Sequence, residues 1–596
     1  MANTVSVVEK PIPASVSKDA YILGIQDNGN GQQALYRMPI GDVRGNGAND
    51  LFIIPSLIEE YGTAEAFRMF AEANGDYDTL TNITTRFFAA AAKAVNKTYT
   101  SQFYKFNTSN STIGEKQDDN ALLTCTPSTN ASAGTDDYKD LPLFACFDCN
   151  YNIDATTLEP VIHAIKGVYG TFNKAAADSF VGVLQMTGWV RRTTTETTKK
   201  VEYRAQQAEG FVPLPEGVRA SDNSVRPFVI HAKYAAGLNS AGKLSSVSGV
   251  QPATSRSGSA GSKSISHDGQ ISLWRAWGNQ YGGSGLCDIA FVQLMLEIKY
   301  AVLGSAQVMQ GCRNYSTSYK AAVSESEVTR ILLTAANAAY FIVGSSVSLG
   351  SSSDRSSSNC YNTCDIVKIA SKEVVEVEGT EYTAINLDTT TAFSTTAGET
   401  YITPHPWRTG STDAVLGNDG SPTSNSNQKE PFKLQGIELM LGMYEVPGDT
   451  TCQETATSGD VPGVYKVYTN RLAANIRSGG SGVDPVQVGT ITKSGSSAGW
   501  KYVAELNWEA NDQEAYMLGK QYGGGASSSN GYRAGHYLDA ESTTGWREWL
   551  AYGLLALGGF CGFACAVLSN VLGLAYWHIG ARALGTGGNR GEYTAA

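Results

Sequence analysis

An uncharged, glycine-rich apolar segment near the C-terminus constrains this chain more than any other feature. Residues 550–567 contain no charged side chain, and a stretch of that length is enough to cross the hydrocarbon core of a bilayer. Its glycines disfavour a simple helix, because each one costs roughly 0.5–1 kcal/mol in a helix interior. The segment is therefore either a glycine-rich membrane anchor or a loop-rich surface that displays apolar side chains.

The composition of the whole chain favours a surface-binding protein of several domains. Its 596 residues allow about two to four domains, and its net charge of −11 argues against bulk attraction to nucleic acid or to an anionic membrane. The 30 tyrosines and 63 glycines are typical of adaptable binding surfaces. The first ten residues show no basic stretch followed by an apolar core, so we predict no secretory signal and expect assembly in a cytosol.

Residue types that carry chemistry are present without the spacing that chemistry needs. The ten cysteines include the close pair Cys146 and Cys149, but no second pair completes a zinc site, so we interpret them as buried thiols and expect no metal and no cofactor. Glu509, Asp512 and Glu514 lie near Trp508 and could flank a glycosidic bond. A solvated acidic loop is the commoner arrangement, and the chain is predicted not to be an enzyme.

Hydrophobic periodicity predicts a mixture of helices and strands. The predicted elements are a hairpin over 20–39, helices over 63–73, 79–95, 288–308 and 324–339, a helical patch near Val161–Val168, and strands over 365–403, 436–442 and 502–506. The helix over 324–339 depends on a capping box formed by Ser324 and Glu327.

The C-terminal end has a pattern that resembles a known family. Arg547 is followed by Gly558-Gly559, by Gly562-Phe-Ala, and finally by Trp577-His-Ile-Gly-Ala-Arg582. This order resembles the variable region of proteins diversified by retroelements, which carry a C-type-lectin-like fold and commonly close with a Trp-x-Ile-Gly-x-Arg-Leu type strand. Here Ala583 precedes Leu584 where that leucine would come. Weaker upstream pieces resemble the tail- or head-fibre proteins of gut bacteriophages.

The resemblance implies an α+β fold, with a mixed α/β N-terminal region and a C-terminal C-type-lectin-like domain that has long insertions. Residues 1–105 would attach to the particle, 106–204 would form a mixed β stem, and 205–596 would be the lectin-like region with a variable binding surface at 546–584. We expect a fragment starting near Pro213 to fold by itself. Gln251-Pro-Ala253 lacks the acid of calcium-dependent sugar-binding motifs, so calcium is not implied.

Diversification in this family mutates template adenines, so that asparagine codons never become codons for Trp, Met, Lys, Glu or Gln. None of these five residues occurs between Leu550 and Tyr576, which agrees with the resemblance and also with a membrane segment. We interpret Phe563, Ala564 and Cys565 as buried packing beneath the site. The residues expected to contact a ligand are Tyr552, Leu554, Leu555, Leu557, Phe560, Leu574, Tyr576 and His578, and those expected to form the scaffold are Trp577, Ile579, Gly580 and Arg582.

On this interpretation the chain is a bacteriophage virion protein, made in the host bacterial cytoplasm, that binds a bacterial surface protein or glycan. Other phage structural proteins would be its partners, and several copies would add up weak contacts as a homo-oligomer, with a trimer as the working assumption. Nucleic acid and membrane insertion are not expected. Two alternatives remain open: a tail-anchored membrane protein with 549–568 as its transmembrane segment, and a tail-associated enzyme that cleaves glycans.

Overall fold

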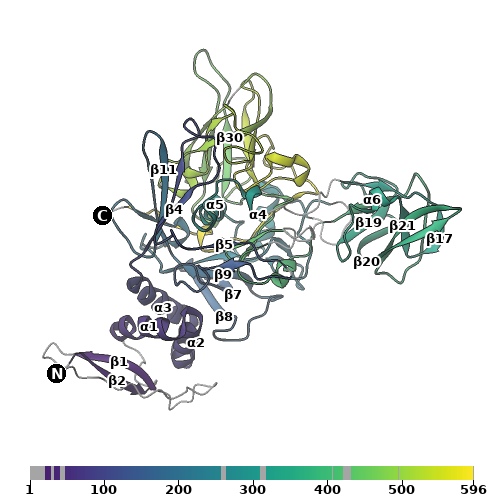
Figure 1. The fold of residues 1–596 in the computed structure, drawn as a ribbon. Helices are drawn as coiled ribbons and strands as arrows, with labels where there is room; N and C mark the ends of the chain where they lie inside the picture. Colours follow the sequence, from purple (N-terminus) through teal and green to yellow (C-terminus); the bar gives the residue numbers. More distant parts are fainter. Residues whose placement is uncertain are drawn as a thin grey trace.

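A computed structural model describes residues 21–27, 33–39, 47–129, 131–256, 263–308, 317–405, 407–420, 431–493 and 495–594 of the chain. The protein is α+β, and its sheets are mostly antiparallel. A helical unit lies at one end of a large β-rich body, and a smaller β-rich unit projects from the side of that body (Figure 1). The predicted class is confirmed at this level.

The N-terminal part is a hairpin followed by three helices. The hairpin pairs β1 (Tyr21–Asp27) with β2 (Gln33–Pro39) in the predicted region, and its turn residues 28–32 lie outside the described residues. The helices are α1 (Gly47–Tyr61), α2 (Thr63–Asn74) and α3 (Leu80–Ala94). Helix α3 lies within the predicted range 79–95, and Thr79 caps it by accepting a hydrogen bond from the Asn82 amide at 3.2 Å.

Two antiparallel sheets connect these helices to the body. The five-stranded sheet has the order β12 (Val212–Pro213), β10 (Trp189–Thr194), β11 (Thr198–Arg204), β3 (Thr98–Tyr104), β4 (Glu115–Asp118). The four-stranded sheet has the order β13 (Phe228–Ala232), β9 (Phe180–Met186), β7 (Cys146–Ile153), β8 (Pro160–Ile165). Phe67 and Phe88 pack their rings against Phe147 of β7 at centroid distances of 5.3 and 6.3 Å.

Helix α5 (Leu286–Tyr300) lies at the centre of the body, and every residue from Leu286 to Lys299 is buried. The predicted helix continues to Val308, but the observed one ends earlier because Ala301 adopts a left-handed conformation, φ 50°. The chain leaves the helix there, and Val302 forms an isolated antiparallel β-bridge with Ile113. A shorter helix, α4 (His267–Arg275), precedes α5 and was not predicted.

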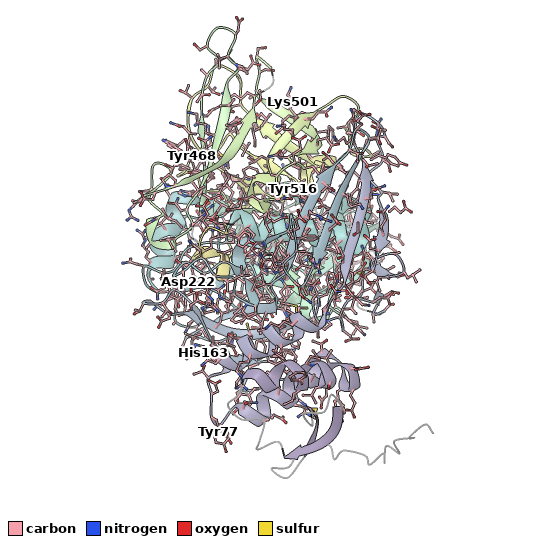
Figure 2. All side chains as sticks on the ribbon, turned by 90° about the vertical axis from the view of Figure 1, so that its left-hand side faces the viewer. Tyr77, His163, Asp222, Tyr468, Lys501 and Tyr516 are labelled. Carbon is pink, nitrogen blue, oxygen red and sulfur yellow. The ribbon has the colours of Figure 1, made fainter. Side chains whose placement is uncertain are left out.

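The C-terminal residues build two further sheets. The seven-stranded sheet has the order β31 (Gly519–Tyr522), β30 (Gly499–Leu506), β32 (Gly535–Leu538), β35 (Ala566–Val567), β34 (Leu550–Ala551), β26 (Tyr444–Glu445), β36 (Ile579–Gly580). The four-stranded sheet has the order β29 (Val486–Thr492), β28 (Val464–Thr469), β27 (Thr450–Glu454), β33 (Gly545–Glu548). In Figure 2, Lys501 and Tyr468 of these sheets lie at the opposite end of the molecule from Tyr77 of the helical unit.

Residues 319–404 form the projecting unit, which has a hydrophobic core of its own. Its main sheet has the order β16 (Tyr319–Lys320), β23 (Tyr401–Pro404), β19 (Ser346–Gly350), β20 (Cys364–Val377), β21 (Thr380–Leu387), β18 (Arg330–Leu333). A small sheet pairs β17 (Glu325–Val328) with β22 (Phe393–Thr395).

Two helical predictions are wrong for the same physical reason. Residues 324–339 form β17, β18 and only a short helix, α6 (Ala335–Ala338). The patch at Val161–Val168 is mostly strand β8, in which Ile162 is buried while Val161 is 39% exposed. In both cases the partner strands β21 and β7 override the local helical signal, which is a weak preference.

The main hydrophobic core does not follow the predicted boundaries at 105 and 204, because it includes residues from Ile53 to Leu584. Strand β13 pairs with β9, and the Tyr151 hydroxyl donates a hydrogen bond to the Leu584 carbonyl at 2.6 Å. Residues 205–596 therefore share one hydrophobic core with the segments before residue 205, rather than having the separate core that we expected.

A fragment of residues 213–596 is expected to be insoluble or to melt without a cooperative transition. It loses the partner strand of β13 and thereby exposes apolar residues that form one continuous core. Thermal unfolding followed by circular dichroism measures this, with a fragment of residues 47–596 as the folded control. Cooperative melting of the shorter fragment at the control's temperature would contradict the shared core.

Candidate binding surface

The apolar C-terminal segment folds as short strands and turns. Between β34 and β35 the chain makes a 3₁₀ turn, η8 (Leu555–Phe560), in which Gly558 has φ 57° and ψ −121°. Residues 549–568 thus do not form the helix that the membrane-anchor hypothesis requires. Across the described part of the chain, no helix combines the length and the hydropathy needed to cross a bilayer.

Arg582 fixes the base of this segment. Its guanidinium pairs with Glu445 of β26 at 3.1 Å and donates hydrogen bonds to the carbonyl oxygens of Ala232, Lys233 and Glu438 at 3.2, 3.2 and 2.8 Å. Burial raises the pKa of Glu445, and the adjacent guanidinium opposes that effect. The expected scaffold role of Arg582 therefore has a physical basis in a buried, multiply bonded cation.

The other expected scaffold residues differ in burial. Ile579 is fully buried, and Gly580 lies against Met440, whose Cε would be 2.5 Å from an added Cβ. Trp577 is only half-buried, and the Arg355 guanidinium lies over its ring at 4.9 Å from the centroid. The expected strand began at Trp577, but the observed strand β36 begins at Ile579 and includes neither Trp577 nor His578.

The stretch 561–568 is buried throughout, which confirms the prediction for Phe563, Ala564 and Cys565. His536 anchors it: His536 Nε2 lies 3.1 Å from the Ala564 carbonyl, and Nδ1 lies 2.8 Å from the Tyr522 hydroxyl. Since a carbonyl only accepts, Nε2 carries the proton and Nδ1 accepts from the tyrosine. Burial lowers the pKa of His536 to about 4, so this imidazole is neutral near pH 7.

Three of the expected ligand contacts lie around a stack of aromatic rings. We call Leu554, Leu557 and Phe560, together with the rings that stack on Phe560, the first patch. Leu554, Leu557 and Phe560 are half-buried. The Phe560 ring stacks on Trp500 at 5.1 Å and on Tyr502 at 4.2 Å. This close approach depends on Gly535, since a Cβ there would lie 2.4 Å from the Phe560 ring.

The expected contacts Leu574, Tyr576 and His578 lie just before β36, and we call them the second patch. Tyr576 is 39% exposed and stacks on His578 with a centroid distance of 5.4 Å and an interplanar angle of 9°. Leu574 is half-buried beside them in the sequence, and Val571 is 50% exposed. Burial and the nearby Arg355 lower the pKa of His578 to about 4.

The remaining two expected contacts do not belong to either patch. Tyr552 is 1% exposed, so the expectation that its side chain is displayed is wrong. It directly follows β34, and its ring packs against Phe563 at a centroid distance of 6.1 Å. The side chain of Leu555 lies outside the described residues.

Sequence reasoning missed Trp500 and Tyr502, whose rings stack on Phe560 in the first patch. They alternate along β30 and therefore point to the same face of the sheet. An aromatic i, i+2 pair on a predicted strand is a signal that could have found them, but pairing them with Phe560 requires the tertiary structure.

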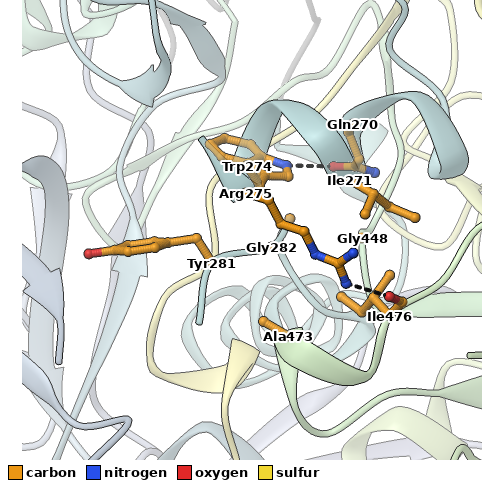
Figure 3. A pocket seen from close by; sticks show the side chains of 10 residues that line it. Gln270, Ile271, Trp274, Arg275, Tyr281, Gly282, Gly448, Ala473 and Ile476 are labelled. Carbon is orange, nitrogen blue, oxygen red and sulfur yellow. Dashed lines mark hydrogen bonds between the residues drawn. The ribbon is translucent and has the colours of Figure 1, made fainter. Parts of the chain in front are cut away.

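Cavities also lie away from the C-terminal segment. The one beside α4 has a volume of about 10 Å³, which suits about one water molecule, and Gln270, Trp274 and Arg275 are among its lining residues (Figure 3). A polar pocket of about 300 Å³ includes His163 and Asp178, and one of about 420 Å³ lies between α1 and α3. None of these pockets contains a residue of the C-terminal segment.

Of the carboxylates considered for glycan cleavage, Glu509 and Asp512 are exposed and Glu514 is buried. Glu514 is 1% exposed and pairs with Arg590. Asp512 caps a short helix, α7 (Gln513–Tyr516), by accepting a hydrogen bond from the Glu514 amide at 2.8 Å. The Glu514 carboxylate is therefore held in a buried ion pair with Arg590.

No family model matches this chain, and no curated protein shows significant sequence similarity to it.

Substituting Arg582→Met is expected to lower the free energy of unfolding by about 3–5 kcal/mol, because the Glu445 charge stays buried without its partner. Adding Glu445→Gln should recover part of that loss, since the unpaired charge is then absent. Guanidinium denaturation of the two variants and the wild type measures the effect. Equal destabilisation in the single and double variants would contradict the role given to the ion pair.

Acid is expected to weaken the fold through His536. Between pH 6.5 and 4 the unfolded chain binds a proton at this residue that the folded chain does not, so stability is complete above about pH 6.5 and falls as the pH approaches 4. The pKa of about 4 corresponds to a loss of at most about 3 kcal/mol. Melting of the wild type and of His536→Gln at pH 7, 5.5 and 4.5 isolates this contribution. Parallel pH dependences would contradict it.

Proposed function

We propose that this protein is a bacteriophage virion protein that attaches to a ligand on the bacterial surface through its C-terminal segment. The proposal rests on the contrast between buried and half-exposed side chains within residues 546–584. A base of buried residues, secured by Arg582 and His536, presents two patches of half-exposed aromatic and aliphatic side chains. Exposed apolar patches on a rigid base are typical of interaction sites.

The sequence pattern supports the retroelement-diversified variant of this proposal. The closing Trp577–Arg582 motif and the absence of five residue types from 550–576 agree with a variable region. In a diversified protein, the variable side chains must change without disturbing the fold. Half-buried side chains such as Leu557 and Tyr576 meet that requirement better than Tyr552, which is fully buried.

The same closing motif leads us to propose a C-type-lectin-like fold for residues 205–596. The chain closes with β36 in the seven-stranded sheet beside β26, and the helices α4 and α5 precede these strands in sequence. Virion attachment belongs to the N-terminal part in this proposal. Several copies, provisionally three, would add weak contacts into firm attachment.

Replacing Leu574 and Tyr576 together by Ser is expected to abolish binding to host cells and to leave the melting temperature nearly unchanged. Apolar anchors at an interface carry most of the binding free energy, whereas partly exposed side chains contribute less to the core. Leu557→Ser combined with Phe560→Ser tests the first patch in the same way. The measurement is pull-down of the full chain across a panel of bacterial strains.

Leu122→Ser is the matched control, because Leu122 is an apolar residue that is 94% exposed outside the segment. It should leave cell binding intact. Undiminished binding by both patch variants would overturn the assignment of the site. A near-copy of the coding region for 546–584 that differs at adenines, beside a reverse transcriptase gene, is the observation expected in the surrounding DNA.

A further inference from the structure

Three potential metal ligands from distant parts of the sequence meet in the core of the body. Glu216 lies in a 3₁₀ turn, η2 (Pro215–Gly217), His231 lies on β13, and Asp288 lies in the first turn of α5. One donor atom of each lies within 4.8 Å of the other two, and all three residues are buried. His231 Nδ1 is 2.7 Å from Asp288 Oδ1.

Polar atoms in this cluster lack the partners that buried groups need. Glu216 is 0% exposed, and neither of its carboxylate oxygens accepts a hydrogen bond from another residue. His231 Nε2, on a side chain that is also buried, has no partner either. Buried carboxylates without a partner are strongly unfavourable, and native proteins retain them where a cation or a proton compensates the charge.

The arginines close to Glu216 are engaged by other carboxylates. Arg226 donates to the Glu216 backbone carbonyl at 3.0 Å and pairs with Glu159 at 2.9 Å. Arg590 pairs with Asp449 at 2.9 Å and with Glu514. No lysine or arginine forms an ion pair with Glu216 or Asp288 among the described residues. The side chains of this cluster thus bring two carboxylates and an imidazole together without a fixed cation between them.

In a second cluster of the same protein, a lysine compensates the charge of the carboxylates. Cys125, Asp136 and Asp419 also lie within 4.8 Å of one another. There the ammonium group of Lys299 pairs with Asp419 and lies 3.3 Å from Asp136. The chain itself supplies the positive charge at that cluster, and it supplies none of this kind at Glu216.

We propose that Glu216, His231 and Asp288 bind a divalent transition-metal ion, with Zn²⁺ as the best match. Imidazole and carboxylate donors suit zinc, whereas calcium and magnesium favour sites made wholly of oxygen. Donors about 2.0–2.2 Å from one ion lie at most about 4.4 Å apart, so the observed spacing needs only a small adjustment. The site is buried like a structural metal site, and its three protein donors leave the fourth position of a tetrahedral ion to another ligand such as water.

The position of the site defines its role. The turn η9 (Thr586–Gly588), which follows β36, covers it, because a Cβ added at Gly587 would lie 2.9 Å from Glu216 Cγ and 2.8 Å from Cys287 Sγ. The metal would therefore tie η2 to β13 and α5, directly beneath the turn that follows the C-terminal scaffold. This inference does not depend on the proposed ligand of the surface patches.

Glu216→Gln distinguishes a metal site from a metal-free core, because it preserves shape and removes one charge. If a metal is bound, the variant should retain at least about tenfold less zinc and should melt at a lower temperature. If the core is metal-free, removing an uncompensated carboxylate should leave the melting temperature equal or higher. The two possibilities predict opposite directions for the same substitution.

The experiment uses the full chain, purified without metal-affinity resin. Samples unfolded in guanidinium are refolded either with ZnCl₂ or with a chelator, and then dialysed. Mass spectrometric metal analysis should find about one zinc per refolded wild-type chain, and chelator should lower the refolded yield. Cys125→Ser is the matched control, since it removes a donor from the cluster that contains Lys299, and its zinc content should equal that of the wild type.

Two results would overturn the proposal. One is wild-type protein that refolds equally well with chelator and retains less than about a tenth of an equivalent of zinc, manganese or iron. The other is Glu216→Gln protein that binds zinc like the wild type, because the ion would then lie elsewhere. His231→Gln with the same readouts provides a second variant should Glu216→Gln fail to fold.

Discussion

The burial of helix α5 on every side is the constraint on which the rest of the structure depends. A helix that is buried all round can still contain charged residues, but each one must find a partner in the surrounding chain. Glu297 pairs with Arg192 at 2.8 Å and accepts from the Tyr516 hydroxyl, while Lys299 pairs with Asp419. Segments far apart in the sequence are thereby oriented around one axis.

This arrangement explains why the core crosses the boundaries expected from sequence. Arg192 belongs to the five-stranded sheet before residue 205, and Tyr516 belongs to the C-terminal part. Both reach Glu297, so removing the first part leaves a buried carboxylate without its cation and removing the second leaves it without a hydrogen-bond donor. The unit formed by 319–404 differs because its apolar side chains pack with one another.

The C-terminal segment follows the same logic on a smaller scale. Arg582 binds carbonyl oxygens from two strand regions and the carboxylate of Glu445, which sets the position of the last strand. Glycines supply the close approach that a long apolar helix would not allow, as at Gly535 beneath Phe560. A segment with the composition of a membrane anchor is thus divided between a buried base and two half-exposed patches.

Interactions between residues close in the sequence were sufficient to specify several local elements. The hairpin near residue 30, the Thr79-capped helix and the apolar helix before Tyr300 were predictable, because alternation, capping and periodicity act over a few residues. So was the burial of Phe563–Cys565. Only the tertiary structure decided that Tyr552 is buried while Tyr576 is exposed, and that Trp500 joins Phe560. Strand partners at long sequence separation decide these outcomes, and one sequence does not encode them as a local pattern.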